Sequence, residues 1–147
     1  MRFRRLLIFG SVVALLASAW APAQAGSRSP NYRARLLRIV NDLRAHHGVR
    51  RLDVNIKLSR YAKRHSDEMA DRRRLFHTND LYSRVRAYRA NAWAENVGAG
   101  GTLRSVARAW MRSYAHRLNV LNGRFHKTGI GVVKRGGRVW ITQIFYG

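Results

Sequence analysis

The chain has 147 residues, with 29 lysines and arginines against seven aspartates and glutamates, six histidines and no cysteine. This length fits one domain, and 46% hydrophobic residues are enough to bury a core and too many for a disordered tail. The formal net charge of +22 favours anionic partners and disfavours cationic ones. The lack of cysteine excludes a disulfide scaffold, thiolate catalysis and cysteine-ligated zinc.

The first 25 residues have the pattern of a secretory signal peptide. Three arginines lie among the first five residues, residues 6–19 are almost wholly apolar, and Ala23-Gln24-Ala25 offers the small residues that a signal peptidase reads. The apolar segment has about 14 residues, against ~20 for a bilayer-spanning helix, so an uncleaved anchor is the weaker alternative. We therefore predict cleavage after Ala25 and a secreted or periplasmic protein, exported by the general or the twin-arginine route.

The rest of the chain is predicted to form a single domain with three regular helices. Residues 26–31 are rich in glycine, serine and proline, which predicts a flexible lead-in to a domain over residues 32–147. Apolar residues recur at helical spacing. The predicted helices are residues 32–47, stopped by Gly48, residues 55–72, capped by Asp53 or Asn55, and a third helix capped by Thr102.

The other segments predict loops and a small sheet. Residues 72–89 are basic and weakly periodic, which indicates a long loop or a broken helix. A short extended piece at residues 95–97 leads into a flexible glycine-rich run at residues 98–101. Two β-branched and aromatic segments, 129–133 and 139–146, flank two glycines and predict a hairpin. Together these segments predict an α+β fold, with helices packed on a small antiparallel sheet.

The acidic and histidine residues are few enough to weigh one by one. Glu68 and Arg72 have the spacing of a helix-face ion pair, whereas Glu95 lies at the mouth of a predicted strand, where a carboxylate either pairs with a cation or serves a site. His77 and His116 are predicted to lie in loops. His65 falls in the apolar phase of its helix, so we expect a buried neutral imidazole hydrogen-bonded to backbone. The remaining histidines, His46, His47 and His126, are interpreted as surface or packing residues.

Five segments appear in an order that is typical of one known family. They are Val40-Asn41-Asp42-Leu43-Arg44 before a glycine, Phe76-His77-Thr78, Ala94-Glu95-Asn96-Val97, Ala109-Trp110-Met111-Arg112-Ser113 leading to His116-Arg117, and Phe125 before Gly129-Ile130-Gly131-Val132. Over residues 33–146 the sequence resembles the CAP superfamily, which includes cysteine-rich secretory proteins, venom antigen 5 and plant pathogenesis-related proteins of class 1. The lack of cysteine resembles the simpler bacterial type.

The resemblance implies a three-layer α-β-α sandwich with a surface cleft lined by two histidines and two acidic residues. His77 and His116 match the two cleft histidines, and Glu95 matches the glutamate of the family's Gly-Glu-Asn motif, with Ala94 in place of the glycine. The second family glutamate falls at Tyr82, and Asp80 is the nearest carboxylate. The resemblance therefore implies an incomplete set of four.

Two imidazoles that converge on one point can hold Zn²⁺ or a similar divalent ion. We expect His77 and His116 to be the ligands and Glu95 to orient one ring from outside the metal's own ligand set. Two nitrogens fall short of the four ligands of a structural zinc site, so weak or adventitious occupancy is expected.

A hydrolase that uses His77, Glu95 and His116 is the catalytic alternative. Ser113 is a possible nucleophile, but a role in ending or capping a helix is favoured for it. Neither a Gly-x-Ser-x-Gly elbow nor a His-Glu-x-x-His helix occurs in the chain. We therefore favour binding over catalysis.

The 25 arginines suggest a second role as a cationic module that binds polyanions or the cell envelope. We expect nonspecific adhesion to anionic surfaces or polymers, while a high arginine content of the source genome is the alternative explanation. Binding of a lipid or other small ligand is a third possibility, with Tyr82, Tyr88 and Trp93 as candidate contacts. No nucleic-acid readout motif is present, so specific nucleic-acid binding is disfavoured, and a monomer is expected.

Overall fold

The computed structural model describes residues 31–147. The predicted signal peptide and most of the lead-in lie outside these residues. Asn31, which the sequence analysis assigned to the lead-in, instead caps the first helix, because its side-chain oxygen accepts a hydrogen bond from the backbone N–H of Ala34 at 3.1 Å.

Residues 31–147 form five α-helices, one 3₁₀ turn and four strands, in the order α1-β1-α2-α3-η1-β2-α4-α5-β3-β4. The helices are α1 (Tyr32–His46), α2 (Ile56–Asp71), α3 (Leu81–Val85), α4 (Leu103–Arg112) and α5 (Tyr114–Leu121), with the 3₁₀ turn η1 at Arg86–Tyr88. The strands are β1 (Asp53–Val54), β2 (Trp93–Gly100), β3 (Lys127–Arg135) and β4 (Arg138–Tyr146). Among residues 31–147, no helix is long and apolar enough to span a bilayer.

The sheet has the strand order β1-β3-β4-β2. The predicted hairpin is confirmed as β3 and β4, joined through Gly136 and Gly137 at φ of 58° and 72°, the left-handed pair that a two-residue hairpin turn requires. The sheet differs from the predicted antiparallel one in that the two-residue strand β1 pairs with β3 in parallel. The strand β2 is also longer than predicted, and lies at the open edge of the sheet beside β4.

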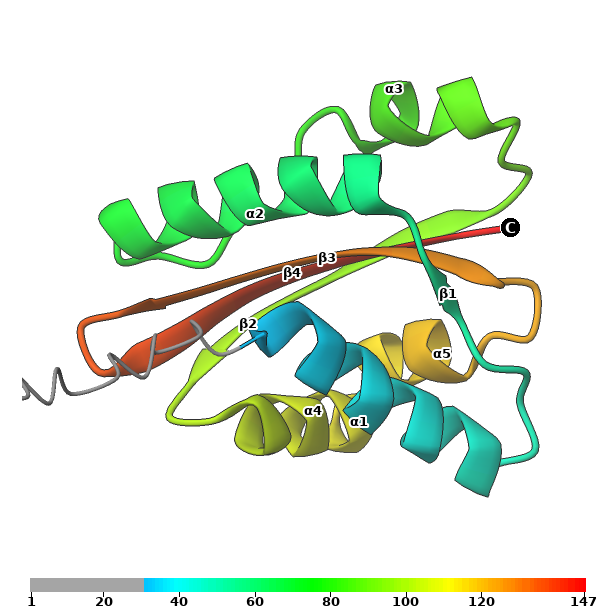
Figure 1. Cartoon of the computed structure of the whole chain (residues 1–147), viewed down its shortest axis with the longest axis horizontal. Coiled ribbons are helices and arrows are strands. Elements are labelled where there is room, and N and C mark those ends of the chain that lie inside the picture. Colours follow the sequence, from blue (N-terminus) through cyan, green and yellow to red (C-terminus); the bar gives the residue numbers. More distant parts are fainter. Residues whose placement is uncertain (1–30) are drawn as a thin grey trace, which may run out of the picture.

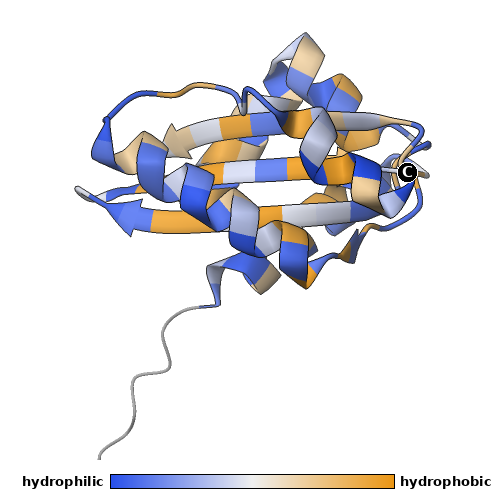
Figure 2. Cartoon of the chain, turned by 90° about the horizontal axis from the view of Figure 1, so that it is seen from above, coloured by the Kyte–Doolittle hydropathy of each residue, from blue (hydrophilic) through white to orange (hydrophobic). Residues whose placement is uncertain are grey.

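The predicted three-layer α-β-α sandwich is confirmed. Figure 1 shows α2 and α3 on one face of the sheet, with α1, α4 and α5 on the other. Seen from above, α2 presents mainly hydrophilic residues outward while the apolar segments concentrate in the strands beneath it (Figure 2). The larger core lies between the sheet and the α1/α4/α5 layer and includes Leu36, Val40, Trp110, Ile141 and Phe145. Helix α2 covers the opposite face.

Two kinds of glycine contact set the distance between the layers. A Cβ at Gly131 on β3 would overlap the backbone carbonyl of Ala62, so α2 lies directly on the strand. On the other face, a Cβ at Gly98 would lie 2.6 Å from Val106 Cγ1 and 3.0 Å from Trp110 Nε1, both on α4. The glycines of β2 and β3 thus let helices approach both faces.

One buried arginine ties α1 to the segment that follows α5. The Arg44 side chain is fully buried, and its guanidinium donates to the carbonyls of Arg50, Val120, Asn122 and Phe125 at 2.6–3.1 Å. Burial lowers the pKa of this guanidinium below its usual value. Arg44 is therefore a structural residue of the segment that resembles the CAP superfamily, and not a surface cation.

Candidate functional site

The turn at the end of α2 directs the chain towards the site. Arg73 adopts a left-handed conformation with φ of 50°, and the N–H groups of Arg73 and Arg74 donate to the carbonyls of Ala70 and Met69 at 3.3 and 3.1 Å. This is the pair of bonds that closes a helix and reverses the chain. The Phe76 ring then packs edge-on against His65 with 5.0 Å between ring centroids. Residues 77 and 78 are thereby carried to β2.

Glu95 on β2 fixes this loop through a buried carboxylate. Its side chain is only 3% exposed. Oε1 lies 2.8 Å from His77 Nδ1 and accepts from the backbone N–H of Thr78 at 2.9 Å, and Oε2 accepts from the Thr78 hydroxyl at 2.6 Å. Both carboxylate oxygens are thus occupied, and two segments far apart in sequence are joined. Thr78 was not predicted as a site residue, although it directly follows His77 in the segment that was singled out.

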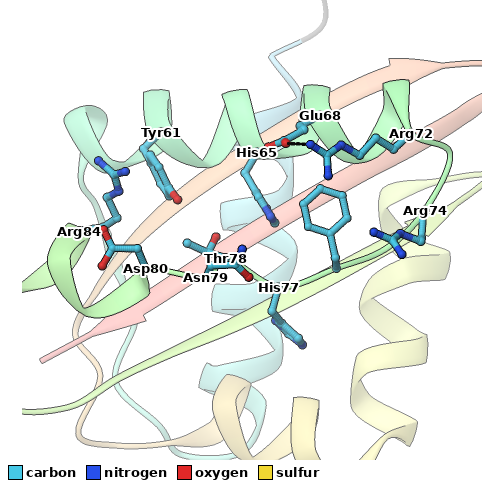
Figure 3. A pocket seen from close by; sticks show the side chains of 11 residues that line it. Tyr61, His65, Glu68, Arg72, Arg74, His77, Thr78, Asn79, Asp80 and Arg84 are labelled. Atoms are coloured by element: carbon cyan, nitrogen blue, oxygen red, sulfur yellow. Dashed lines mark ion pairs between the residues drawn. The ribbon is translucent and has the colours of Figure 1, made fainter.

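His77 is held at one nitrogen and open at the other. Its Nδ1 faces Glu95, while its side chain is 63% exposed. A carboxylate acceptor at Nδ1 favours the tautomer of the neutral ring in which Nδ1 carries the proton and Nε2 has the lone pair. Figure 3 shows the ring turned away from His65 and Tyr61 on α2.

His116 lies in a helix, so the prediction that it lies in a loop is wrong. It lies in the first turn of α5, and its Nδ1 is 2.7 Å from Ser113 Oγ, at the residue that precedes the helix. Ser113 ends α4 and precedes α5, as expected for a capping position, but makes no side-chain bond to the helix backbone. Burial lowers the pKa of His116, and electrostatic interaction with nearby His77 lowers it further. His116 is therefore neutral at pH 7.

The next residue along β2 holds α5 from the other side of the sheet. Asn96 donates to the carbonyl of His116 at 3.1 Å, and its own side-chain oxygen accepts from Asn119 at 2.9 Å. Trp110 Nε1 donates to the carbonyl of Val97 at 3.0 Å. Successive residues of a strand face opposite sides, so Glu95 fixes the loop after α2 and Asn96 fixes α5. The site therefore straddles the open edge of β2.

No second carboxylate joins His77 in the described part of the chain. Tyr82, at the position of the second family glutamate, is 54% exposed and lies against Trp93 with 5.1 Å between ring centroids. Asp80 lines a groove beside α2 and has no ion pair or side-chain hydrogen bond with any of residues 31–147. The tyrosine at this position supplies no carboxylate, and the incomplete set of four residues stays a prediction.

The other predicted residues have structural roles. His65 is 6% exposed, as predicted, but its Nδ1 lies 3.0 Å from the Thr142 hydroxyl and not from a backbone group. Burial lowers its pKa. Tyr88, one of the candidate lipid contacts, stacks on Tyr146 in the core beneath α2, which leaves the Tyr82–Trp93 pair as the exposed aromatic surface. Arg117, beside His116, is exposed.

Two histidines alone could form only an open metal site and not a closed one. Among residues 31–147, no group of three or more histidine or acidic side chains is placed to hold an ion. His77 and His116 each use Nδ1 for a protein contact, at Glu95 and Ser113, and have Nε2 left for a ligand. Two imidazoles would leave two coordination positions to water or a bound molecule.

The sequence comparisons agree with this architecture. The sequence profile of CAP, the cysteine-rich secretory protein family, matches residues 37–145. The chain belongs to the CAP family. It is 30% identical over 123 residues to the uncharacterized protein YkwD of Bacillus subtilis (strain 168), a match that covers 79% of this chain and 47% of YkwD.

Solved structures of other CAP proteins have the same fold. An outer surface protein of Borrelia burgdorferi superposes with a TM-score of 0.70 at 21% identity, over 80% of this CAP chain and 92% of the Borrelia protein. An extracellular SCP-domain protein of Bacillus anthracis gives a TM-score of 0.64 at 25% identity, over 77% of this chain and 39% of that protein. This chain thus spans about half or less of two of these longer relatives.

Proposed function

We propose that this CAP protein is exported and binds a ligand at the edge of β2 through a weak divalent metal site formed by His77 and His116. The hydrogen bond between His77 Nδ1 and Glu95 Oε1 carries the proposal. It fixes the ring orientation and the tautomer that leaves Nε2 free, as carboxylates do for metal-binding histidines. Glu95 has no free oxygen, so it acts by orienting His77.

The ion would supply positive charge and open coordination positions for an oxygen or nitrogen of a small ligand. His116 suits this role because it is neutral at pH 7, which metal binding requires. In the metal-binding form its Nδ1–H donates to Ser113 Oγ and Nε2 has the lone pair. The crystal structure of NaASP2, a protein of the same fold, was determined with Zn²⁺.

Calorimetric titration with Zn²⁺ tests the proposal. The wild type should bind one ion, and the double variant His77→Ala/His116→Ala should lose the heat of binding. The matched control is His46→Ala/His47→Ala, which removes two exposed histidines from the end of α1 and should bind as the wild type does. Equal loss in both double variants, or no heat in the wild type, would reject the site.

A hydrolase is the second candidate, and the Ser113–His116 contact favours it. Here Ser113 Oγ–H would donate to His116 Nδ1, so that the imidazole could take the proton from the hydroxyl. This is the opposite tautomer to the metal-binding one, with the proton of the neutral ring on Nε2. Reaction with a fluorophosphonate that is lost in Ser113→Ala would support the hydrolase, whereas no labelling of Ser113 would favour the binding role.

Export is proposed from the first 25 residues. Two of the structural relatives are described as an outer surface protein and an extracellular protein, which agrees with this proposal. Intact-mass measurement of protein from an expressing bacterium should give a chain that begins at Gly26. A cytoplasmic chain that retains Met1 would contradict it.

A further inference from the structure

A groove of about 390 Å³ lies between α2 and the loop that carries His77. One wall is a stripe of α2 formed by Tyr61, His65, Glu68 and Arg72, which follow one another at helical spacing. At 1.5 Å per residue the stripe is about 16 Å long. Figure 3 shows the loop residues facing it, and the His77 ring turned out of the groove. The groove is thus elongated, and it adjoins the edge of β2 at His77 and Thr78, which also line it.

The groove has a buried nitrogen without a partner among the described residues. His65 is 6% exposed, and its Nε2 is buried and makes no hydrogen bond with any of residues 31–147. Ser66 Oγ lies 3.2 Å from the Gly131 carbonyl and 2.9 Å from Thr142 Oγ1, which in turn lies 3.0 Å from His65 Nδ1. The Nδ1 side of the ring is thus held by hydroxyl groups, and Nε2 is the ring nitrogen that faces away from them. Figure 3 shows this ring directed from α2 towards the loop that carries Thr78.

Arginines lie at both ends of the groove. The Arg84 guanidinium is 4.5 Å from the centre of the Tyr61 ring, and that of Arg74 is 5.7 Å from the centre of the Phe76 ring. Neither forms an ion pair within residues 31–147, whereas Arg72 is neutralised by Glu68 at 2.6 Å. Stacking on an aromatic ring orients a guanidinium and leaves its N–H fork free for an anion.

Acidic groups along the groove limit what it accepts. Besides the paired Glu68, Asp80 lines the groove near Arg84. A compact, highly charged anion would meet these carboxylates. A longer ligand with its negative groups set apart would place them at the two arginines and an uncharged polar group beside the His65 ring, with one water between that group and Nε2.

We propose that this groove binds an extended anionic oligomer, whose separated carboxylate or phosphate groups are held by Arg84 at one end and Arg74 at the other. His77 lines this groove and is also a ligand in the metal proposal, but neither arginine forms a hydrogen bond or ion pair with His77, Glu95 or His116 within residues 31–147, so variants at the arginines test this site separately. Two of the 25 arginines would then serve a specific binding site.

Binding of two probes, an oligogalacturonate and a linear polyphosphate, tests the site at about 0.15 M salt, where nonspecific ionic contacts are screened. The double variant Arg74→Gln/Arg84→Gln should weaken binding of at least one probe by about tenfold or more. The matched control Arg104→Gln/Arg108→Gln removes two exposed arginines from α4, in the opposite layer, and should bind as the wild type does. The probe that responds identifies carboxylate or phosphate as the recognised group.

A nitrogen NMR measurement on His65 gives a second readout. Saturating probe should shift the Nε2 resonance of His65 in the wild type and not in Arg74→Gln/Arg84→Gln. Equal weakening in both arginine double variants would mean adhesion to overall charge and would overturn the proposal. No binding of either probe, or binding that leaves the His65 resonance in place, would also overturn it.

Discussion

His77 Nδ1 lies 2.8 Å from Glu95 Oε1, and this contact joins a loop after α2 to the edge strand of the sheet across 18 residues of sequence. The carboxylate is buried while the imidazole is largely in solvent. Such a pair gives an exposed ring a fixed direction without filling the second nitrogen. The orientation of His77 at the proposed site depends on this contact.

Replacing Glu95 by glutamine should weaken Zn²⁺ binding by about 10- to 100-fold, because the charged acceptor that orients His77 becomes a neutral amide with only one accepting oxygen. We also expect a loss of about 1–3 kcal/mol in the free energy of unfolding, since Thr78 loses part of its anchoring. Glu68→Gln is the control, an exposed glutamate paired with Arg72, and should leave Zn²⁺ affinity unchanged. Wild-type affinity in Glu95→Gln would contradict the orienting role.

Stability should fall in acid because of His65. Burial lowers the pKa of this residue, despite the opposing effect of Glu95 and Glu68. The unfolded chain therefore takes up the proton first as the pH falls, so the stability linked to neutral His65 is complete above about pH 6.5 and is lost below it. The slope for one histidine is at most about 1.4 kcal/mol per pH unit.

Urea unfolding at about pH 7.5 and pH 5.5 measures this effect. His65→Gln should reduce the difference between the two pH values, and exposed His46→Gln should not. The buried His116, with its lowered pKa, accounts for part of the remaining acid loss. An undiminished difference in His65→Gln would show that other groups control the acid response.

Arg44→Lys should destabilise the protein by about 3 kcal/mol or more, because an ammonium cannot reach the four carbonyls that the guanidinium satisfies. The same substitution at Arg51, an exposed partner of Asp42 at 3.6 Å, should cost less than about 0.5 kcal/mol. Chemical unfolding of both variants gives the comparison. Similar small losses would mean that the buried fork contributes little.

Gly131→Ala should prevent α2 from packing on β3, since the added methyl would overlap the Ala62 carbonyl. We expect a loss above about 3 kcal/mol or failure to fold. Gly123→Ala adds the same methyl where no atom lies within 4 Å and should be tolerated. The two midpoints of thermal unfolding decide this, and equal values would show that the layers can separate at small cost.

The sequence was most informative where local pattern and final environment agree. Apolar periodicity predicted α1 and α2 to within about two residues, the usual uncertainty of helix ends. Glu95 was singled out because it is rare and lies at a strand, and the structure gives it a buried carboxylate with three donors. The resemblance to the CAP superfamily placed His77 and Glu95 in one cleft, and the structure brings them into contact.

Other features depend on contacts between distant segments. The glycine-rich segment at the end of β2 was expected to be flexible, but it is part of the strand. A glycine is needed at residue 98 because Val106 and Trp110 of α4 pack against it and leave no room for a Cβ. Helix α5 has only eight residues and little apolar periodicity, so the sequence pattern did not predict it and His116 was expected in a loop. The helix is held instead by a distant contact, in which Asn96 of β2 donates to the His116 carbonyl. Asn119 was missed for the same reason. Strand β1 has only two residues, too few for an alternating sequence pattern. It pairs with β3, the strand on which the following helix α2 packs.

Anomalous X-ray diffraction from crystals soaked in Zn²⁺ tests the central claim most directly. The account predicts one strong zinc peak at about 2.0–2.1 Å from Nε2 of both His77 and His116, with Nδ1 of His77 still bonded to Glu95. No peak at the edge of β2, or a peak that contacts only one of the two rings, would contradict it.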